Sequence, residues 1–143
     1  MFETATHPAL MFNHLSLSVI DFDRSLKFYD GVLPLLGYPR QFMNDPADGY
    51  RERVASYSPP GQEDGFAIRH RPAANLKPDD GFHIAFDAPS HAAVDAFYEA
   101  ALKLGGRDNG PAGFHPDHGE NYYAAFVFDP DGYRIEAVCR SDQ

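Results

Sequence analysis

The hydrophobic pattern of the chain consists of short strand-like runs and two segments with helical spacing. Residues 13–19 and 82–88 read as strands, and each run has a histidine at its second position. Each is followed by a segment whose apolar residues recur every three or four positions, beginning after Asp21 in one half and after Ser90 in the other. Aspartate and serine are favourable helix N-caps, so the pattern predicts a strand followed by a helix, twice.

These two strand–helix units repeat at a separation of 69 residues, which is the separation of His14 and His83. The same separation relates the two N-caps, a Phe-Tyr pair in each helix and a glycine after each helix, where glycine is a natural stop. The matched pairs are Phe28-Tyr29 with Phe97-Tyr98 and Gly37 with Gly106. Agreement at so many types of position predicts an internal repeat rather than two unrelated halves.

Each half continues with about three further strands. Asp-Gly followed by alternating residues is typical of a turn into a strand, and it occurs at 64–65 and 131–132, now 67 residues apart. Further strand-like runs lie at 51–57 and 122–128, and weaker ones lie near residue 41 and at 106–109. We expect an α+β fold in which two tandem βαβββ modules, about 10–72 and about 80–140, form an open curved mixed sheet around a cleft. The whole chain, 1–143, would then be one domain.

Composition and charge exclude several classes of function. Of the 143 residues 43% are hydrophobic, but the chain contains no run of 18 apolar residues that could span a membrane. The formal net charge of -9 disfavours DNA, RNA and anionic membranes as partners. The N-terminus lacks the basic and apolar regions of a secretion signal, and the single cysteine, Cys139, excludes an internal disulfide. We therefore expect a cytoplasmic protein whose partner is a small molecule.

Three side chains are candidate ligands of a metal. His14 and His83 occupy equivalent positions in the repeat, so packing the modules about a pseudo-twofold axis would bring them together. Glu136 lies between apolar neighbours in a predicted strand, so it faces the cleft if those neighbours face a helix. Two histidines and a carboxylate leave open positions on a divalent metal such as Fe, Mn, Zn or Ni. The alternative is that the histidines are satisfied core residues and that Glu136 pairs with Arg69 or Arg134.

These segments resemble the vicinal oxygen chelate superfamily, which includes glyoxalase I, bleomycin-resistance proteins, fosfomycin-resistance enzymes and extradiol dioxygenases. The resemblance covers residues 12–139 and is most specific at 128–138, Phe-Asp-Pro-Asp-Gly-Tyr-Arg-Ile-Glu-Ala-Val. Its other motifs are Asn-His-Leu-Ser-Leu-Ser-Val at 13–19, Ser-Leu-Lys-Phe-Tyr at 25–29, Leu-Gly-Tyr at 36–38 and Phe-His-Ile-Ala-Phe at 82–86. The chain is most similar to small bacterial members of undetermined function. The resemblance implies that His14, His83 and Glu136 ligate the metal and that the protein is a homodimer.

The chain departs from glyoxalase I at one position. Glyoxalase I carries a fourth ligand, usually an acid, in the last strand of the first module, and the 67-residue separation puts Arg69 there. A guanidinium offers only hydrogen-bond donors and cannot ligate a metal, so ordinary glyoxalase activity is not expected. Arg69 would instead bind an anionic group of the substrate or pair with an acid. His70 would replace the ligand only if the register shifted by one residue.

Two further candidates lie in the second module. The loop before the last hairpin contains His115 and His118, which would shuttle protons at neutral pH unless the loop is only a solvated polar segment. Folding that hairpin over its Asp-Gly turn pairs Ala125 with Glu136, so that Tyr123 shares the glutamate's face and hydrogen-bonds a substrate, or packs in the core. The candidate catalytic residues are therefore Arg69, His115 and Tyr123.

Three functions of different classes fit these features. The first is a metal-dependent lyase, isomerase, transferase or dioxygenase that acts on a small oxygenated or anionic molecule. The second is a metal-free protein that sequesters a drug or metabolite, as bleomycin-resistance proteins do. The third is an accessory protein with a vestigial site. The set of three ligands favours the first, because a sequestering protein has no need of it.

Overall fold

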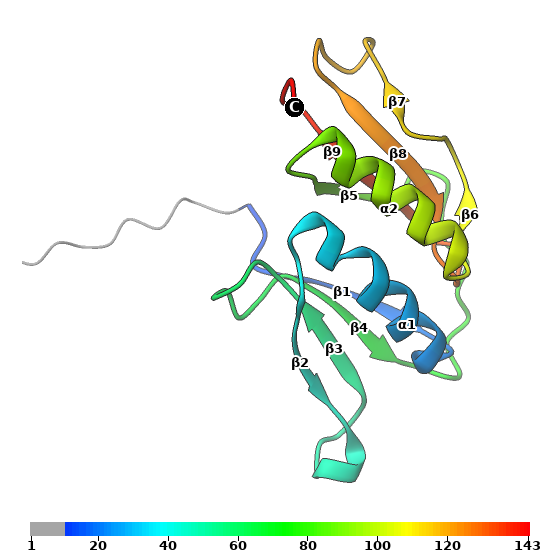
Figure 1. Cartoon of the computed structure of the whole chain (residues 1–143). Helices are drawn as coiled ribbons and strands as arrows, with labels where there is room; N and C mark the ends of the chain where they lie inside the picture. The colour runs from blue at the N-terminus through cyan, green and yellow to red at the C-terminus, as the bar shows by residue number, and fades with distance from the viewer. Residues whose placement is uncertain (1–10) are drawn as a thin grey trace, which may run out of the picture.

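The computed structural model of the chain describes residues 11–143, which form two βαβββ units in tandem (Figure 1). The first unit contains β1 (Leu15–Val19), α1 (Phe22–Val32), the 3-10 turns η1 (Pro34–Leu36) and η2 (Pro46–Asp48), and strands β2 (Arg40–Asn44), β3 (Val54–Tyr57) and β4 (Phe66–His70). The second contains β5 (His83–Asp87), α2 (His91–Lys103), β6 (Arg107–Asp108), β7 (Gly113–Phe114), β8 (Tyr123–Phe128) and β9 (Arg134–Cys139).

Each unit has its own mixed sheet. The strand orders are β1-β4-β3-β2 and β5-β9-β8-β6, with the short β7 also paired to β8. The pairs β1–β4 and β5–β9 are parallel, and the remaining pairs are antiparallel. The predicted α+β fold of two βαβββ modules with an open architecture is confirmed, but each module has its own sheet instead of both sharing one. In both sheets the strand that opens the module, β1 or β5, lies at an edge.

Both helices lie on the same side of the sheets and run side by side (Figure 1). They begin at the predicted caps, where the side chain of Asp21 accepts from the backbone N of Arg24 and that of Ser90 accepts from the backbone N of Ala93. Helix α1 ends at Val32, before the predicted glycine stop, because Pro34 has no amide hydrogen to continue it. The glycine ends the following 3-10 turn instead.

The turn between β8 and β9 joins the two modules. Tyr29 of α1 donates its hydroxyl to Asp129 Oδ2 at 2.6 Å, and Arg24 pairs with Asp131 at 2.8 Å. Tyr133, at the end of the same turn, donates its hydroxyl to the carbonyl oxygen of Ser18 in β1 at 2.9 Å. The turn of the second module is therefore fixed to the first strand and the first helix of the first module.

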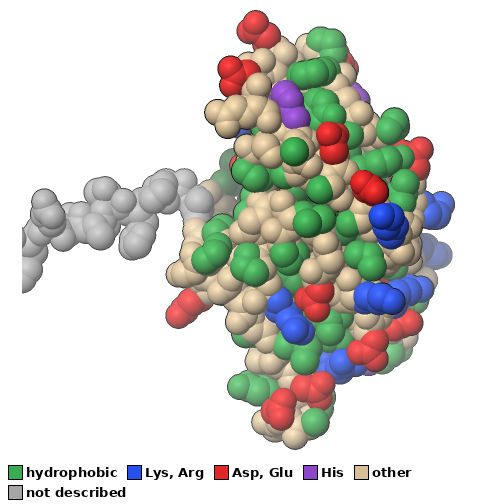
Figure 2. All heavy atoms as spheres, in the orientation of Figure 1, with side chains coloured by type: hydrophobic (Ala, Val, Ile, Leu, Met, Phe, Trp, Pro, Cys, Tyr) green, Lys and Arg blue, Asp and Glu red, His purple; other side chains and the backbone are tan. Residues whose placement is uncertain are grey.

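The surface that carries the helices has mixed charge. Figure 2 shows Lys and Arg side chains lying among Asp and Glu side chains on this face, with apolar side chains between them. Such a surface is unlike the basic patch that a nucleic-acid backbone requires. Among residues 11–143 no helix is both long enough and apolar enough to cross a membrane.

Candidate functional site

The face of the second sheet turned away from α2 carries the candidate metal ligands of that module. Alternation along β9 directs Ile135 and Ala137 into the core and Glu136 to the opposite face. Strand pairing places Ala85 of β5 and Phe126 of β8 on either side of Glu136. Because paired residues share a face of the sheet, these three side chains form one row across it.

His83 and Glu136 lie within direct reach of each other. His83 opens β5, two residues before Ala85 and therefore on the same face, and its Nε2 lies 3.4 Å from Glu136 Oε1. Two ligands about 2.1 Å from one ion in tetrahedral geometry are separated by about 3.4 Å, so this pair is spaced as two ligands of one metal would be. The His83 side chain is 52% exposed and that of Glu136 only 3%. His83 is thus accessible to solvent, whereas Glu136 is buried.

Tyr122 contacts the second oxygen of the same carboxylate. Its hydroxyl donates a hydrogen bond to Glu136 Oε2. Burial, followed by the hydrogen bond and the negative charge of Glu136, raises the pKa of Tyr122 to about 12. The phenol therefore stays protonated at neutral pH and acts as a donor.

The two loop histidines lie beside this group. The ring of His115 packs edge-on against Phe126, with ring centroids 5.2 Å apart. The ring of His118 lies against Tyr122 at 5.1 Å, and its Nε2 is 3.5 Å from Asp117. Both candidate proton carriers thus lie near the face of the sheet that holds Glu136. His115 contacts Phe126, which is the neighbour of Glu136 in β8.

Tyr123 lies on the other face of the sheet. Its hydroxyl donates to Asp95 of α2 at 2.5 Å, and its ring stacks on His91 at 4.4 Å. The predicted pairing of Ala125 with Glu136 is wrong by one residue, because Phe126 is the partner. The physical reason is the length of the hairpin loop: five residues, 129–133, separate the paired Phe128 and Arg134, whereas the pairing of Ala125 with Glu136 requires a loop of four residues, 129–132.

Tyr122 is not among the site residues that the sequence predicts, although the strand pattern contains a signal for it. Residues 122, 124, 126 and 128 share one face of a continuous strand, so the loop length decides whether Tyr122 or Tyr123 accompanies Glu136. The longer loop is closed by Asp129, whose backbone N donates to the carbonyl oxygen of Tyr133 at 2.8 Å. Counting Asp129 and Tyr133 as the ends of the loop would have identified Tyr122.

His14 stands apart from the other two predicted ligands. It directly precedes β1, its side chain is exposed, and its Nδ1 lies 2.7 Å from Asn13 Oδ1. Within residues 11–143 of a single chain, no cluster of three or more His, Cys, Asp or Glu side chains could hold a metal. The structure thus brings His83 and Glu136 together and does not bring His14 to them.

Arg69 is not the structural counterpart of Glu136. Ser16 of β1 pairs with Ala67, as Ala85 of β5 pairs with Glu136. Ser16 and Ala85 are related by the 69-residue repeat, so the counterpart of Glu136 is Ala67. The predicted register of the first module is therefore wrong by two residues. The cause is the loop between β3 and β4, which spans 58–65. Its Asp-Gly directly precedes β4, whereas Tyr133 separates the Asp-Gly of the second module from β9.

Arg69 nevertheless points to the outer face of its own sheet, where it meets an acid. Its Nη1 lies 2.5 Å from Glu52 Oε1, and its Nε lies 3.4 Å from Ser16 Oγ. Arg71 binds the other oxygen of Glu52. Of the two alternatives for Arg69, an acid partner or an anionic substrate, the single chain supplies the acid partner.

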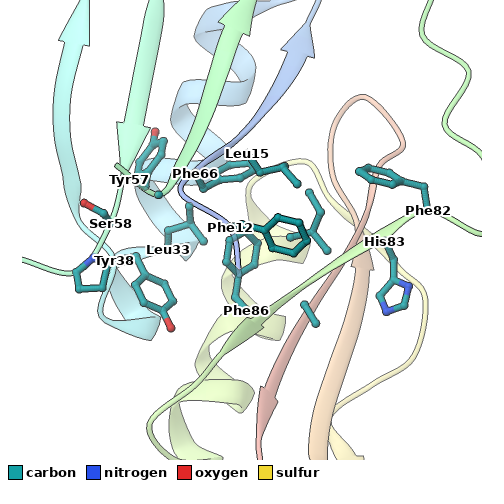
Figure 3. A pocket seen from close by; sticks show the side chains of 14 residues that line it. Phe12, Leu15, Leu33, Tyr38, Tyr57, Ser58, Phe66, Phe82, His83 and Phe86 are labelled. Atoms are coloured by element: carbon teal, nitrogen blue, oxygen red, sulfur yellow. The ribbon is translucent and has the colours of Figure 1, made fainter. Parts of the chain in front are cut away.

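A second feature is an apolar cavity of about 450 Å³ between the modules (Figure 3). It lies between β5 and the ends of β1, β3 and β4, and is walled mainly by aromatic and aliphatic side chains. Figure 3 shows His83 at its margin, with the imidazole directed away from Phe12. The hydroxyls of Tyr38 and Tyr57 already donate to Asp87 and Asp30, so the cavity favours an apolar occupant.

Comparisons of sequence and of structure with known proteins point to the same superfamily. The sequence profile of the Glyoxalase/Bleomycin resistance protein/Dioxygenase superfamily matches residues 11–137. A glyoxalase/bleomycin resistance protein from Albidiferax ferrireducens is 30% identical, with a TM-score of 0.75, and the alignment covers 91% of this chain and 99% of that one. No curated protein sequence gives a significant match.

Two more distant structures share the fold. The fosfomycin resistance protein FosX from Listeria monocytogenes is 17% identical, with a TM-score of 0.65, and the alignment covers 92% of this chain and 94% of that one. A glyoxalase I variant from Zea mays is 22% identical, with a TM-score of 0.65, and the alignment covers 89% of this chain and 45% of that one. At these identities the likeness concerns the fold alone.

Proposed function

Because the chain belongs to the glyoxalase/bleomycin resistance/dioxygenase superfamily, we propose that it is a divalent-metal-dependent enzyme acting on a small oxygenated or anionic molecule. The observation that supports this most directly is the 3.4 Å separation of His83 Nε2 and Glu136 Oε1. Imidazole and carboxylate suit Fe, Mn, Zn and Ni alike, so this donor set leaves the identity of the metal open. A bound metal with open positions would polarise a substrate oxygen.

The third ligand in this proposal is His14 of a partner subunit. Both β1 and β5 have a free edge in the described chain, with His14 at the start of one and His83 at the start of the other. Setting β1 of one subunit beside β5 of another would carry the partner subunit's His14 toward His83 and Glu136. A twofold axis would create two such sites, so this proposal requires a homodimer.

The chain's own side chains supply the remaining functions of the site. A small hollow of about 130 Å³ beside His83 is lined by Asn109, Phe126 and Arg134, among others. In our proposal Arg134, which bonds Asp79 and Asp80, contributes positive charge near an anionic substrate. The imidazole of His115, packed on Phe126, accepts or donates the substrate's proton.

The decisive experiment is a titration of metal-free protein with Zn²⁺, Mn²⁺, Ni²⁺ and Fe²⁺, followed by a substrate screen on each loaded form. We expect one ion per subunit, and we expect binding to weaken at least 100-fold in His83→Ala and in Glu136→Gln. Either variant binding as tightly as the wild type would overturn the site. Wild-type protein that binds none of the four ions would overturn the function.

The second candidate function is a metal-free ligand-sequestering protein. The observation that favours it is the apolar cavity between the modules, whose volume of about 450 Å³ is sufficient for a small ligand. In that case wild-type protein would bind apolar compounds with an affinity that is unchanged by a chelator. We further propose a cytoplasmic location, which is supported by the lone buried Cys139.

A further inference from the structure

We propose that Tyr122 is a positioning residue that turns Glu136 so that only one of its carboxylate oxygens faces the metal. This inference rests on the metal site proposed above. Glu136 Oε2 accepts the hydroxyl of Tyr122, whereas Oε1 lies 3.4 Å from His83 Nε2. The two oxygens of one carboxylate are thus divided between a phenol and the imidazole of the other ligand.

The phenol is itself held in place by the loop that carries it. The backbone N of His115 donates to the carbonyl oxygen of Tyr122 at 2.8 Å, and the backbone N of Tyr122 donates to that of Gly119 at 3.3 Å. The ring of His118 covers the ring of Tyr122, with centroids 5.1 Å apart and planes tilted by 32°. A tyrosine anchored through both its backbone and its ring can impose an orientation on the group it contacts.

The surroundings of Glu136 make this hydrogen bond consequential. The side chain is 3% exposed, and its neighbours across the sheet, Ala85 and Phe126, have no side-chain donors. Among residues 11–143, the Glu136 carboxylate accepts one hydrogen bond, and its donor is the hydroxyl of Tyr122. A buried carboxylate oxygen without a donor is costly, so loss of the hydroxyl would leave Oε2 to seek another partner.

This arrangement has a consequence for ligation. With Oε2 engaged by Tyr122, Glu136 contributes one oxygen and leaves a further coordination position free for substrate. Partners that orient a ligand in this way contribute about 10–100-fold to metal affinity or activity. The role assigned to Tyr122 is therefore orientation of the ligand, not proton transfer.

The test is a Co²⁺ titration of metal-free wild type, Tyr122→Phe and Tyr123→Phe, with the visible absorption of the bound ion recorded alongside the affinity. Tyr123→Phe is the matched control, because it removes a hydroxyl from the adjacent residue, whose partner is Asp95 of α2. We expect Co²⁺ affinity to fall about 10–100-fold in Tyr122→Phe. We expect its absorption spectrum to change as Oε2 joins the coordination. The control should match the wild type in both measurements.

The possible outcomes separate this inference from the proposed function. If the wild type binds Co²⁺ and Tyr122→Phe has the same affinity and spectrum, the positioning role is wrong and the metal site stands. If the wild type binds neither Co²⁺ nor any of the four ions named above, both are wrong. Circular dichroism melting of the three proteins fixes a temperature at which all are folded, and the titrations are compared there.

Discussion

His14 and Glu136 occupy opposite environments, although both are proposed ligands of one ion. The side chain of Glu136 is 3% exposed, whereas His14 lies on the surface and contacts its neighbour Asn13. A glutamate buried in a strand is unusual and needs a partner, which Tyr122 supplies. His14, by contrast, is exposed at the start of an edge strand, so its imidazole is available to a second molecule.

We predict that His14→Ala abolishes metal binding without loss of stability. Its only described side-chain partner is Asn13, so its removal creates no cavity and leaves no buried polar group. Metal content should fall below one tenth of the wild-type value, and the midpoint of urea unfolding of the metal-free protein should stay the same. A lowered midpoint of metal-free protein would indicate a structural role for the imidazole instead.

Arg69→Glu is predicted to leave metal affinity unchanged, because Ala67, not Arg69, corresponds to Glu136 in the strand pairing. The substitution sets two carboxylates beside each other at Glu52. Since the Arg69 side chain is 40% exposed, solvent screening limits the loss of stability to about 1 kcal/mol. Chemical unfolding and a metal titration of the same variant measure both effects. Tighter metal binding would restore the register first inferred from the Asp-Gly turns.

At the scale of elements, the turn between β8 and β9 serves two purposes. It sets the alternation of β9 that carries Glu136, and its acids hold α1 of the other module. Asp129 is buried and accepts hydrogen bonds from the backbone N of Tyr133, from that of Asp131 and from the hydroxyl of Tyr29. Burial nevertheless has the largest effect and raises the pKa of Asp129 to about 6.

This pKa makes the stability of the fold depend on pH. The folded protein holds the proton of Asp129 more tightly than the unfolded chain, whose value is near 3.8. The contribution of Asp129 is therefore fully present below about pH 4, decreases as pH rises to about 6 and is constant above that. We predict that the unfolding free energy of the wild type falls between pH 4 and pH 6.5 by on the order of 2 kcal/mol more than that of Asp129→Asn. Parallel curves for the two proteins would contradict this.

At the scale of the whole molecule, the position of the third ligand decides how many chains make one site. If the partner subunit's His14 completes the site, then His14→Ala and Glu136→Gln affect different halves of it. In a heterodimer of the two variants, one site loses both side chains and the other site is intact. The two variants can be co-expressed with different tags, and the heterodimer can be purified through both tags. We predict that this heterodimer binds about one metal ion.

Each variant purified alone should bind no metal, and a heterodimer of His83→Ala with Glu136→Gln should also bind none. The last pair is the matched control, because both residues come from the same chain in our proposal and each site therefore lacks one of them. No recovery in the His14→Ala and Glu136→Gln heterodimer would show that the two side chains do not meet across an interface. A monomer in sedimentation at micromolar concentration would refute the dimer itself.

The sequence by itself determined the elements and the repeat. Helix caps such as Asp21 and Ser90, apolar periodicity and the closing motif are local signals, and local signals fix strands, helices and their order. They also placed Glu136 on the face of its strand opposite Ile135, because alternation depends only on the neighbours in the chain. The repeat made His14 and His83 equivalent in sequence.

Tertiary structure alone decided which side chains meet. The lengths of two hairpin loops moved Tyr122 into contact with Glu136, moved Tyr123 to Asp95 and made Ala67 the counterpart of Glu136. A loop of one more residue reverses every side chain that follows, and no local pattern reveals that length. Equivalence in sequence also did not bring His14 to His83, since helix packing and the bonds of the β8–β9 turn together set how the modules sit in one chain. Contact between distant residues is a property of the packed molecule, whereas periodicity is a property of the chain.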